Sequence, residues 1–181
     1  MADFYLRRLT RWQAEQQRGP FADMFVEAYD EGAAGEEFRD RQDFLRRFED
    51  DVQQPAFDMV VAENPQPLGC AYGFRVHRSG RWWKGVGAGL PADLEELTAS
   101  GQVFVIAELM VPPRSRRTGV ATRLQEHLLA RSDAARAIAL VAAGNTAAEA
   151  AYRAWAWEDL GEVGAAGGRP PLRAWSRSLP G

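Results

Sequence analysis

The segment 111–121, VPPRSRRTGVA, has the residue types of an anion-binding turn. An apolar strand is predicted to end at Val111, and a helix is predicted to begin near Gly119. The first turn of a helix carries amide N–H groups that the helix itself cannot pair, at the positive end of its dipole. Gly119 lets the backbone approach an anion, and Arg116 and Arg117 add positive charge beside it. The spacing therefore indicates a phosphate-binding turn, although a plain strand-to-helix connection would have the same pattern.

This turn resembles the signature of the GNAT superfamily of acyl-coenzyme A dependent N-acetyltransferases. The family pattern is Gln or Arg, two residues, Gly, one residue, then Gly or Ala, placed after a β-strand and opening a helix. Arg116, Gly119 and Ala121 match it. The strand residues before the turn and the apolar helix after it fit the same template.

A second element of the resemblance lies further along the chain. Asn145 follows a predicted strand, and an alanine-rich helix with Tyr152 comes next, followed by an aromatic residue at Trp157. The resemblance covers residues 57–163. The family often has Gly-Phe after the tyrosine helix, where this chain has Ala156 before the tryptophan. If position 156 needs a positive φ, alanine there costs roughly 1 kcal/mol.

The resemblance implies that acetyl-coenzyme A is the co-substrate and that no metal takes part. The pyrophosphate would accept hydrogen bonds from the backbone at the helix start, that is from Arg116, Arg117, Thr118, Gly119, Val120, Ala121 and Thr122. The backbone of Met110 and Val111 would pair with the pantetheine arm at the splayed end of strand 102–111. Asn145 would reach the far end of that arm.

The implied reaction is attack of an amine on a thioester in a ternary complex. An aliphatic amine has a pKa of about 10, so a group must accept its proton. Glu108 is the carboxylate nearest to the C-terminal end of strand 102–111. Partial burial would give it a raised pKa suited to a general base. Alternatively, Glu108 pairs with an arginine or positions the acceptor. The resemblance gives Tyr152 the role of O–H donor to the leaving thiolate, with packing under the cofactor as the alternative.

The acceptor is expected to bind beside the N-terminal helices and the loop before strand 102–111. The candidates are aromatic: Phe25, Tyr29, Trp82 and Trp83, with Phe38 and Phe44 nearby. An acidic group would favour a cationic amine, or else form a solvated face: Glu27, Asp30, Glu31, Glu36 and Glu37. We expect a small-molecule primary amine as acceptor. A peptide or protein amine, and a non-catalytic module that only binds acyl-coenzyme A, are the alternatives.

The predicted elements give an α/β (α+β) fold. They are a strand near residues 4–9, two N-terminal helices, a hairpin of 57–63 and 68–76, a loop with Trp82 and Trp83, a short helix opening at Pro91, strand 102–111, helix 119–131, strand 138–142, helix 147–155, and strands 157–163 and 172–178. Their order predicts a central mixed, mostly antiparallel sheet flanked by helices, with a parallel pair, 102–111 and 138–142, splayed around the acyl-coenzyme A site. We expect one domain over 1–181, with an acceptor-side region at 1–55, a cofactor core at 57–163 and a last strand at 172–178.

Composition narrows the class of protein. Over 181 residues, 46% are hydrophobic and 26% charged, as in soluble globular proteins. The net charge of −3 argues against a nucleic-acid partner, and the lone Cys70 excludes an internal disulfide. Without a visible signal segment or a bilayer-length apolar run, we expect a cytoplasmic protein with no membrane partner. An exposed edge strand would suit a homodimer.

Overall fold

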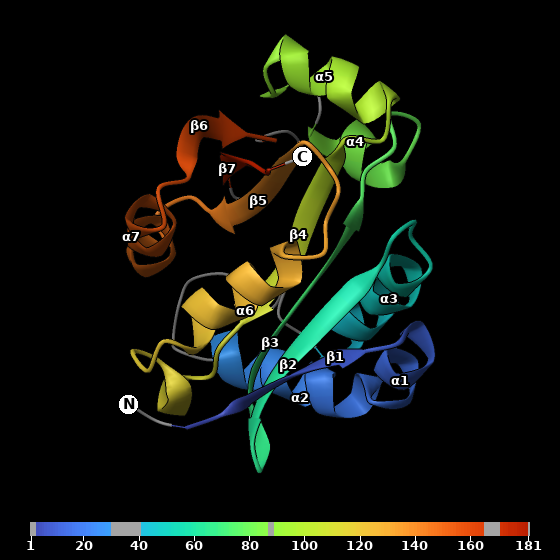
Figure 1. Ribbon diagram of the computed structural model, residues 1–181. Coiled ribbons are helices and arrows are strands. Elements are labelled where there is room, and N and C mark those ends of the chain that lie inside the picture. The colour runs from blue at the N-terminus through green and yellow to red at the C-terminus, as the bar shows by residue number, and fades with distance from the viewer. Residues whose placement is uncertain (1–2, 30–40, 87–88, 165–170, 181) are drawn as a thin grey trace. The chain divides into compact units, whose positions relative to one another are not determined.

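The computed structural model describes residues 3–29, 41–86, 89–164 and 171–180 (Figure 1). Its elements are, in chain order, β1 (Tyr5–Leu9), α1 (Arg11–Gln16), α2 (Arg18–Tyr29), α3 (Arg41–Val52), β2 (Asp58–Asn64), β3 (Gln66–Arg75), α4 (Arg81–Val86), α5 (Ala92–Ala99), β4 (Val103–Met110), the 3₁₀ turn η3 (Pro113–Ser115), α6 (Val120–Leu129), β5 (Arg136–Ala142), α7 (Thr146–Ala154), β6 (Glu158–Val163) and β7 (Leu172–Ser178). Within these ranges the strands form a seven-stranded sheet in the order β1-β2-β3-β4-β5-β7-β6. β4 and β5 run parallel, whereas the pairs β1–β2, β2–β3, β5–β7 and β6–β7 are antiparallel. The predicted mixed, mostly antiparallel sheet is confirmed.

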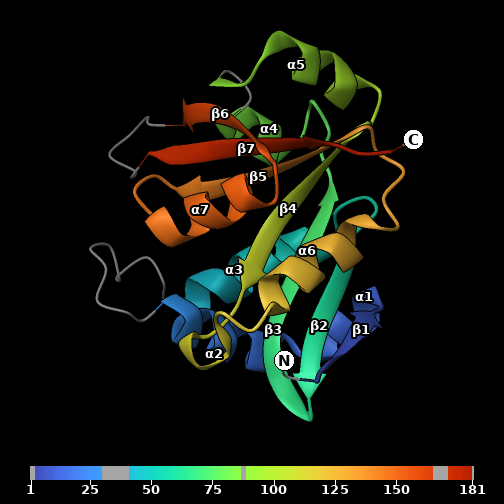
Figure 2. The same ribbon diagram turned by 60° about the vertical axis from the view of Figure 1, so that its left-hand side comes forward.

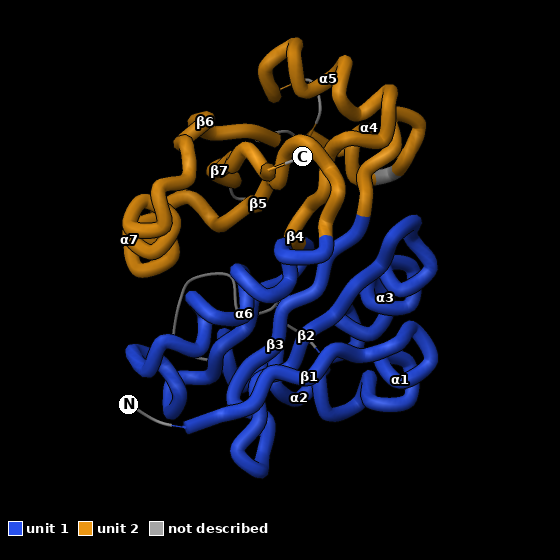
Figure 3. Tube along the Cα trace, viewed as in Figure 1, with its two compact units in different colours: residues 1–74, 107–131 blue, residues 75–106, 132–181 orange. Residues whose placement is uncertain are grey.

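The described residues group into two compact units, each built from two stretches of the chain (Figure 3). Unit 1 contains residues 1–74 and 107–131, and unit 2 contains residues 75–106 and 132–181. β4 belongs to both, because its first half lies in unit 2 and its second half, with Glu108 and Met110, in unit 1. The predicted single domain, with its division of the chain at residues 55–57 and 163–172, stays a prediction.

Unit 1 has helices on both faces of its strands, and alternation along β2 explains why. Met59 and Val61 point into the core formed with α2 and α3, whereas Val60 and Ala62 are buried on the other face. There α6 packs against β2, opposite α2 and α3 (Figure 2). A strand that is apolar at successive positions therefore carries helices on both of its sides.

Residues at the N-termini of α1 and α2 explain where these two helices begin. Helix α1, which the predicted elements omit, starts with a capping box: the Thr10 hydroxyl accepts from the Gln13 amide at 3.1 Å, and the Gln13 side chain accepts from the Thr10 amide at 2.9 Å. Helix α2 begins at Arg18, which places Pro20 in its first turn, where a missing N–H is tolerated. The Thr-x-x-Gln spacing is thus a sequence signal for α1.

The segment with the two tryptophans differs from its prediction. Residues 81–86 form helix α4 instead of a loop, and the Lys84 amide donates to the Gly80 carbonyl at 3.2 Å at its start. Trp82 and Trp83 are partly buried. The expectation of a loop rested on the nearby glycines, but partial burial of two large apolar side chains stabilises a single turn-and-a-half of helix against that propensity.

Ala156 has a φ of +61°, so the alanine at the position after the tyrosine helix is strained as its sequence context indicated. We expect Ala156→Gly to raise the free energy of unfolding by roughly 1 kcal/mol, because glycine adopts this backbone without a Cβ clash. Urea denaturation measures the change. Ala154→Gly, at the exposed end of α7, is the matched control and should lower stability instead. Equal effects of the two substitutions would contradict strain at position 156.

Candidate functional site

The predicted anion-binding turn lies where β4 gives way to α6, within unit 1. The chain passes from Met110 through η3, and Arg117 and Gly119 then take left-handed backbone conformations with φ of +62° and +83°. The Thr118 hydroxyl donates to the Ser115 carbonyl at 2.5 Å and so closes the turn. Gly119 is the N-cap of α6, which begins at Val120. Left-handed residues in a turn at the start of a ten-residue helix are a backbone arrangement that can bind an anion, so the geometry is compatible with the predicted site.

The space beside Gly119 is open. A Cβ built on Gly119 meets no atom within 4 Å, so the space beside the helix start is available to a bound group. The side chains of Ala121 and Thr122, in the first turn of α6, are partly exposed. The residues present therefore fit a phosphate that lies against the backbone.

The arginines of the turn also have structural contacts. Arg116 donates from Nε to the Val111 carbonyl at 3.1 Å and from Nη2 to the Ala28 carbonyl at 2.6 Å. Arg114 donates to the Glu27 carboxylate at 2.8 Å. These contacts connect the turn to the end of α2. Arg114 and Arg116 therefore stabilise the position of the turn as well as adding positive charge to it.

The end of β4 is closely approached by β3. A Cβ built on Gly69 would lie 2.8 Å from the Met110 carbonyl oxygen and 3.1 and 3.2 Å from Val120 and Val111. Only a residue without a side chain fits there. Gly69 therefore sets the position of the strand end whose backbone is predicted to pair with the pantetheine arm, a role that sequence spacing did not signal.

Glu108 is 9% exposed and lies among residues of α2 and α3. Its Oε1 accepts from Arg47 Nη1 at 3.0 Å, and the Tyr29 hydroxyl donates to its Oε2 over a long 3.4 Å. Burial lowers the pKa of Arg47, but the charge and hydrogen bond of Glu108, together with the charges of Tyr72 and Asp51, raise that pKa overall. Of the alternatives for Glu108, pairing with an arginine is therefore realised in the structure.

Two further groups of unit 1 adjoin this pair. Tyr72 is fully buried and donates to Asp51 Oδ2 at 2.7 Å. Burial raises the pKa of Asp51 to about 6, against the lowering effects of the Tyr72 hydrogen bond and the Arg47 charge. Burial and the charge of Glu108 raise the pKa of the Cys70 thiol, which lies in the core of unit 1.

The raised pKa of Asp51 makes stability depend on pH. The unfolded carboxyl ionises near pH 3.8 and the folded one near 6, so the folded state holds its proton longer and loses stability as the pH rises through this window. We expect Asp51→Asn, which still accepts from Tyr72, to remove a decrease of at most about 3 kcal/mol between pH 4 and 7. Urea unfolding of both proteins across this range measures the difference, with the exposed Glu49→Gln as control. A difference that does not change with pH would contradict the assignment.

Tyr152 lies in unit 2, on α7, and is 4% exposed. Its ring is held edge-on by Trp155 and Trp157, each with a centroid distance of 5.1 Å, and stacks on Trp175 at 6.0 Å. Such packing fixes the ring and hence the place of its hydroxyl. Both roles considered for Tyr152 need this fixed ring.

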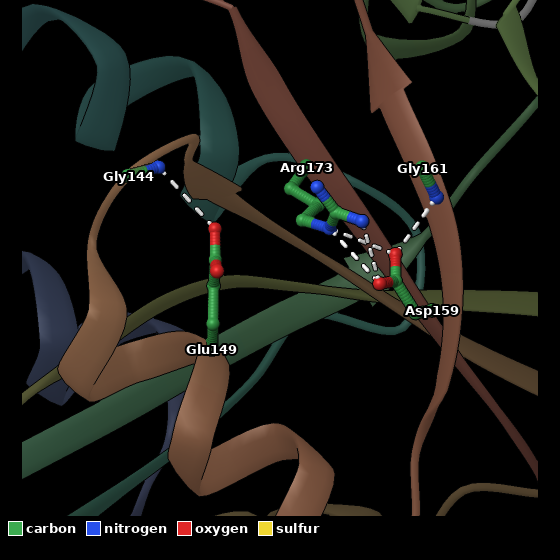
Figure 4. A network of polar contacts seen from close by, with 5 residues as sticks. All are labelled: Gly144, Glu149, Asp159, Gly161 and Arg173. Carbon is green, nitrogen blue, oxygen red and sulfur yellow. Dashed lines mark hydrogen bonds and ion pairs between the residues drawn. The ribbon is translucent and has the colours of Figure 1, made fainter.

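Asn145 has a local structural role at the start of α7. Its Oδ1 accepts from the Ala148 amide at 3.1 Å, which caps the helix. In Figure 4 the Glu149 carboxylate also reaches back to the Gly144 amide, at 3.2 Å. The same view shows Arg173 donating to Asp159 between the paired strands β6 and β7, from Nε at 2.9 and 3.0 Å and from Nη2 at 2.7 Å. The contact of Asn145 with the cofactor stays a prediction.

The predicted acceptor residues divide between the units. Phe25 and Tyr29 lie in unit 1, with ring centroids 4.8 Å apart, and Trp82 and Trp83 lie in unit 2. Phe25 is 5% exposed and Phe44 is fully buried, so both support the core, whereas Tyr29 has exposed surface. Several predicted residues lie outside the described ranges: Asp30, Glu31, Glu36, Glu37 and Phe38.

Two negative findings apply to the described part of the chain. In the ranges that the structure describes, His, Cys, Asp and Glu side chains form no group of three or more that could hold a metal ion. Within the same residues, every helix is too short or too polar to cross a bilayer.

Comparison with known proteins gives one family. A sequence model of the acetyltransferase (GNAT) family matches residues 9–156. No curated protein matches the chain in sequence. Among solved structures, it is similar to an acetyltransferase from Thermus thermophilus, with 15% identity, a TM-score of 0.68 and 98% of each chain covered. It is also similar to yncA, a putative acetyltransferase from Salmonella typhimurium with its cofactor acetyl-CoA, with 15% identity, a TM-score of 0.65, and 99% of this chain and 96% of that one covered. A ribosomal-protein-alanine N-acetyltransferase from Brucella melitensis has 20% identity and a TM-score of 0.61, with 97% of this chain and 99% of that one covered.

Proposed function

Because the chain belongs to the GNAT family of acetyltransferases, and is thus an acyltransferase, we propose that it transfers an acetyl group from acetyl-coenzyme A to a primary amine of a small molecule. Both substrates would be bound together in a ternary complex. The observation that carries this proposal is the open turn at Gly119, which has a positive φ and free space beside it at the start of a ten-residue helix.

The turn suits the phosphates of coenzyme A. Backbone amides between Arg116 and Thr122 would donate to the pyrophosphate, and the Cβ-free Gly119 would let it lie against the main chain. Met110 and Val111, at the end of β4, would offer backbone groups to the pantetheine arm. When bound, acetyl-coenzyme A supplies the acetyl group as a thioester, whose C–S bond breaks as the amine nitrogen bonds to the acetyl carbon.

Glu108 and Tyr152 would take part in the two proton transfers of this reaction. The attacking amine must lose a proton, and the Glu108 carboxylate, partly desolvated beside Arg47, would hold the acceptor and take that proton directly or through water. Tyr152, held in its aromatic cluster, would donate its O–H to the departing sulfur.

The acceptor class has a rival. The similar Brucella melitensis structure is a ribosomal-protein-alanine N-acetyltransferase, so a peptide or protein amine is the alternative acceptor. A module that binds acyl-coenzyme A without catalysis would need the turn but neither Glu108 nor Tyr152. The presence of both side chains favours an enzyme.

The test is a thiol-release assay. The protein is incubated with acetyl-coenzyme A and a library of small amines and N-terminal peptides, and free coenzyme A thiol is followed by its reaction with a chromogenic disulfide. Release that depends on a small amine supports the proposal, whereas release only with peptides favours the rival acceptor. Thermal stabilisation by coenzyme A without release on any amine would favour the non-catalytic module.

A further inference from the structure

The last turn of α2 is held from outside the helix by an arginine of the turn at Gly119. The final carbonyl groups of a helix have no partner within it. One of them, the Ala28 carbonyl, accepts from Arg116 Nη2 at 2.6 Å, and the same guanidinium donates from Nε to the Val111 carbonyl at 3.1 Å. Its positive charge also lies at the negative end of the helix dipole. Arg116 therefore connects the end of α2 to the residue that follows β4.

A second arginine of the same segment contacts the same turn of α2. Arg114 donates from Nε to the Glu27 carboxylate at 2.8 Å and from Nη2 to the Pro67 carbonyl at 3.1 Å. The side chains of Arg114 and Glu27 are 50% and 45% exposed, so water weakens this ion pair. Arg116 instead donates to the backbone of the buried Ala28, and a charge-assisted bond to a shielded carbonyl is stronger. Arg116 is therefore the main connection between the two segments.

The end of α2 also contacts the groups around Glu108. The Tyr29 hydroxyl donates to Glu108 Oε2 over 3.4 Å, and the Phe25 ring centre lies 4.8 Å from that of Tyr29. The Arg47 guanidinium carbon lies 5.2 Å from the Phe25 ring centre, and Arg47 Nη1 donates to Glu108 Oε1 at 3.0 Å. All of these residues belong to unit 1. The end of one helix therefore contacts both the segment that precedes α6 and the side chains around the carboxylate proposed for proton transfer.

We infer that Arg116 couples the turn at Gly119 to the end of α2, so that an anion bound at the turn stabilises the last turn of this helix and the side chains beside Glu108. Arg116 is a positioning residue in this coupling, since the two bonds described above join protein segments to one another. The inference rests on the proposed function for the identity of the anion, the pyrophosphate of coenzyme A. Its consequence is that the surroundings of Glu108 become more ordered once coenzyme A is bound.

Local opening of the helix end is the physical basis of the coupling. The last turn of a helix opens and closes more readily than its middle, and opening of α2 would take the Ala28 carbonyl away from Arg116. An anion that fixes the backbone of residues 116–122 fixes the position of Arg116 and thereby favours the closed helix end. The two effects are reciprocal: the closed helix end raises the affinity for the anion by the same factor.

Amide hydrogen exchange, followed by NMR, measures this coupling in the full chain, free and saturated with coenzyme A. We expect coenzyme A to slow exchange in the last turn of α2, residues 26–29, at least about fivefold, the lower end of ordinary coupling between two sites. Exchange in the first turn of α2 should change little. Coenzyme A that binds without slowing exchange at residues 26–29 would overturn the inference.

Two variants separate the coupling from general stability. Arg116→Lys keeps the positive charge of the turn, but its ammonium group lacks the planar fork that reaches two carbonyls, so the slowing at residues 26–29 should be lost. Arg41→Gln is the matched control, because Arg41 donates at 3.4 Å to another α2 carbonyl, that of Gly19 in the first turn. It should keep the full slowing. Equal slowing in Arg116→Lys and wild type would overturn the inference, and so would loss of slowing in both variants, which would indicate general loosening of α2.

Inorganic pyrophosphate keeps the inference distinct from the proposed function. The exchange experiment is repeated with pyrophosphate alone, which has linked phosphates like those of coenzyme A but no acetyl group to transfer. Slowing that depends on Arg116, with either ligand, supports the coupling even where no amine gives thiol release and acetyl transfer is refuted. If calorimetry detects binding of neither coenzyme A nor pyrophosphate, the turn binds no such anion and the inference is overturned.

Discussion

Gly119→Asp should raise the Kd for coenzyme A by at least roughly 10²-fold, because the new carboxylate would face the pyrophosphate across the turn. Two unit charges about 4 Å apart repel by about 4 kcal/mol near a protein surface. Since about 1.4 kcal/mol changes a Kd tenfold, this repulsion is large enough for the expected increase. The open space beside Gly119 leaves room for the side chain, so repulsion rather than a clash is the reason. Isothermal titration with coenzyme A measures the loss.

Two glycine variants isolate the charge from the backbone. Gly119 has a φ of +83°, so any side chain there adds strain. Gly119→Ala adds this strain without charge and should weaken binding far less than the aspartate. Gly101→Asp places the same residue at a φ of +71°, also in open space, outside the turn, and should leave the Kd unchanged. Retained affinity in Gly119→Asp would refute the phosphate site.

Tyr152→Phe should lower kcat by roughly 10²-fold or more, with little change in KM for acetyl-coenzyme A. The substitution keeps the ring within its cluster of tryptophans and removes only the hydroxyl that would protonate the leaving sulfur. Steady-state kinetics across pH measures the effect. The decline of kcat at high pH that reports a catalytic acid should also disappear in the variant.

The control for this prediction is Tyr5→Phe, which removes a hydroxyl from a side chain that is 72% exposed on β1. Its kcat should equal that of wild type. Thermal melts of both variants establish that they are folded. An unchanged kcat in Tyr152→Phe would remove the tyrosine from proton transfer and leave it the packing role.

Local features of the fold could be predicted because nearby residues encode them. The start of α6 after Gly119 and the bounds of β7 at 172–178 follow from glycine, proline and alternating apolar residues within a few positions. Helix α1 was omitted although Thr10 and Gln13 carry its signal. Helix α4 was missed because partial burial of its tryptophans, a tertiary effect, competes with the glycines that follow.

The candidate site could be predicted only in part. The turn at Gly119 was predicted because its glycine and arginines lie within four consecutive residues, and its anion-binding role stays a prediction. The pairing of Arg47 with Glu108 was not predicted, because Arg47 is one of several arginines on α3. Its spacing three residues after Phe44 and four before Asp51 places it at the border of the apolar face, a signal that could have singled it out.

By itself, the sequence determined the strand, turn and helix around Gly119 and the class of sheet, mostly antiparallel with one parallel pair. Tertiary structure alone decided which groups those residues meet: Glu108 pairs with Arg47, 61 positions away, and Arg116 donates to the Ala28 carbonyl, 88 positions away. The physical reason is the separation along the chain over which each effect acts. Backbone conformation depends on neighbours in the chain, whereas the partner of a buried charge depends on which helix packs over its strand, and that choice is made only when the core of unit 1 forms.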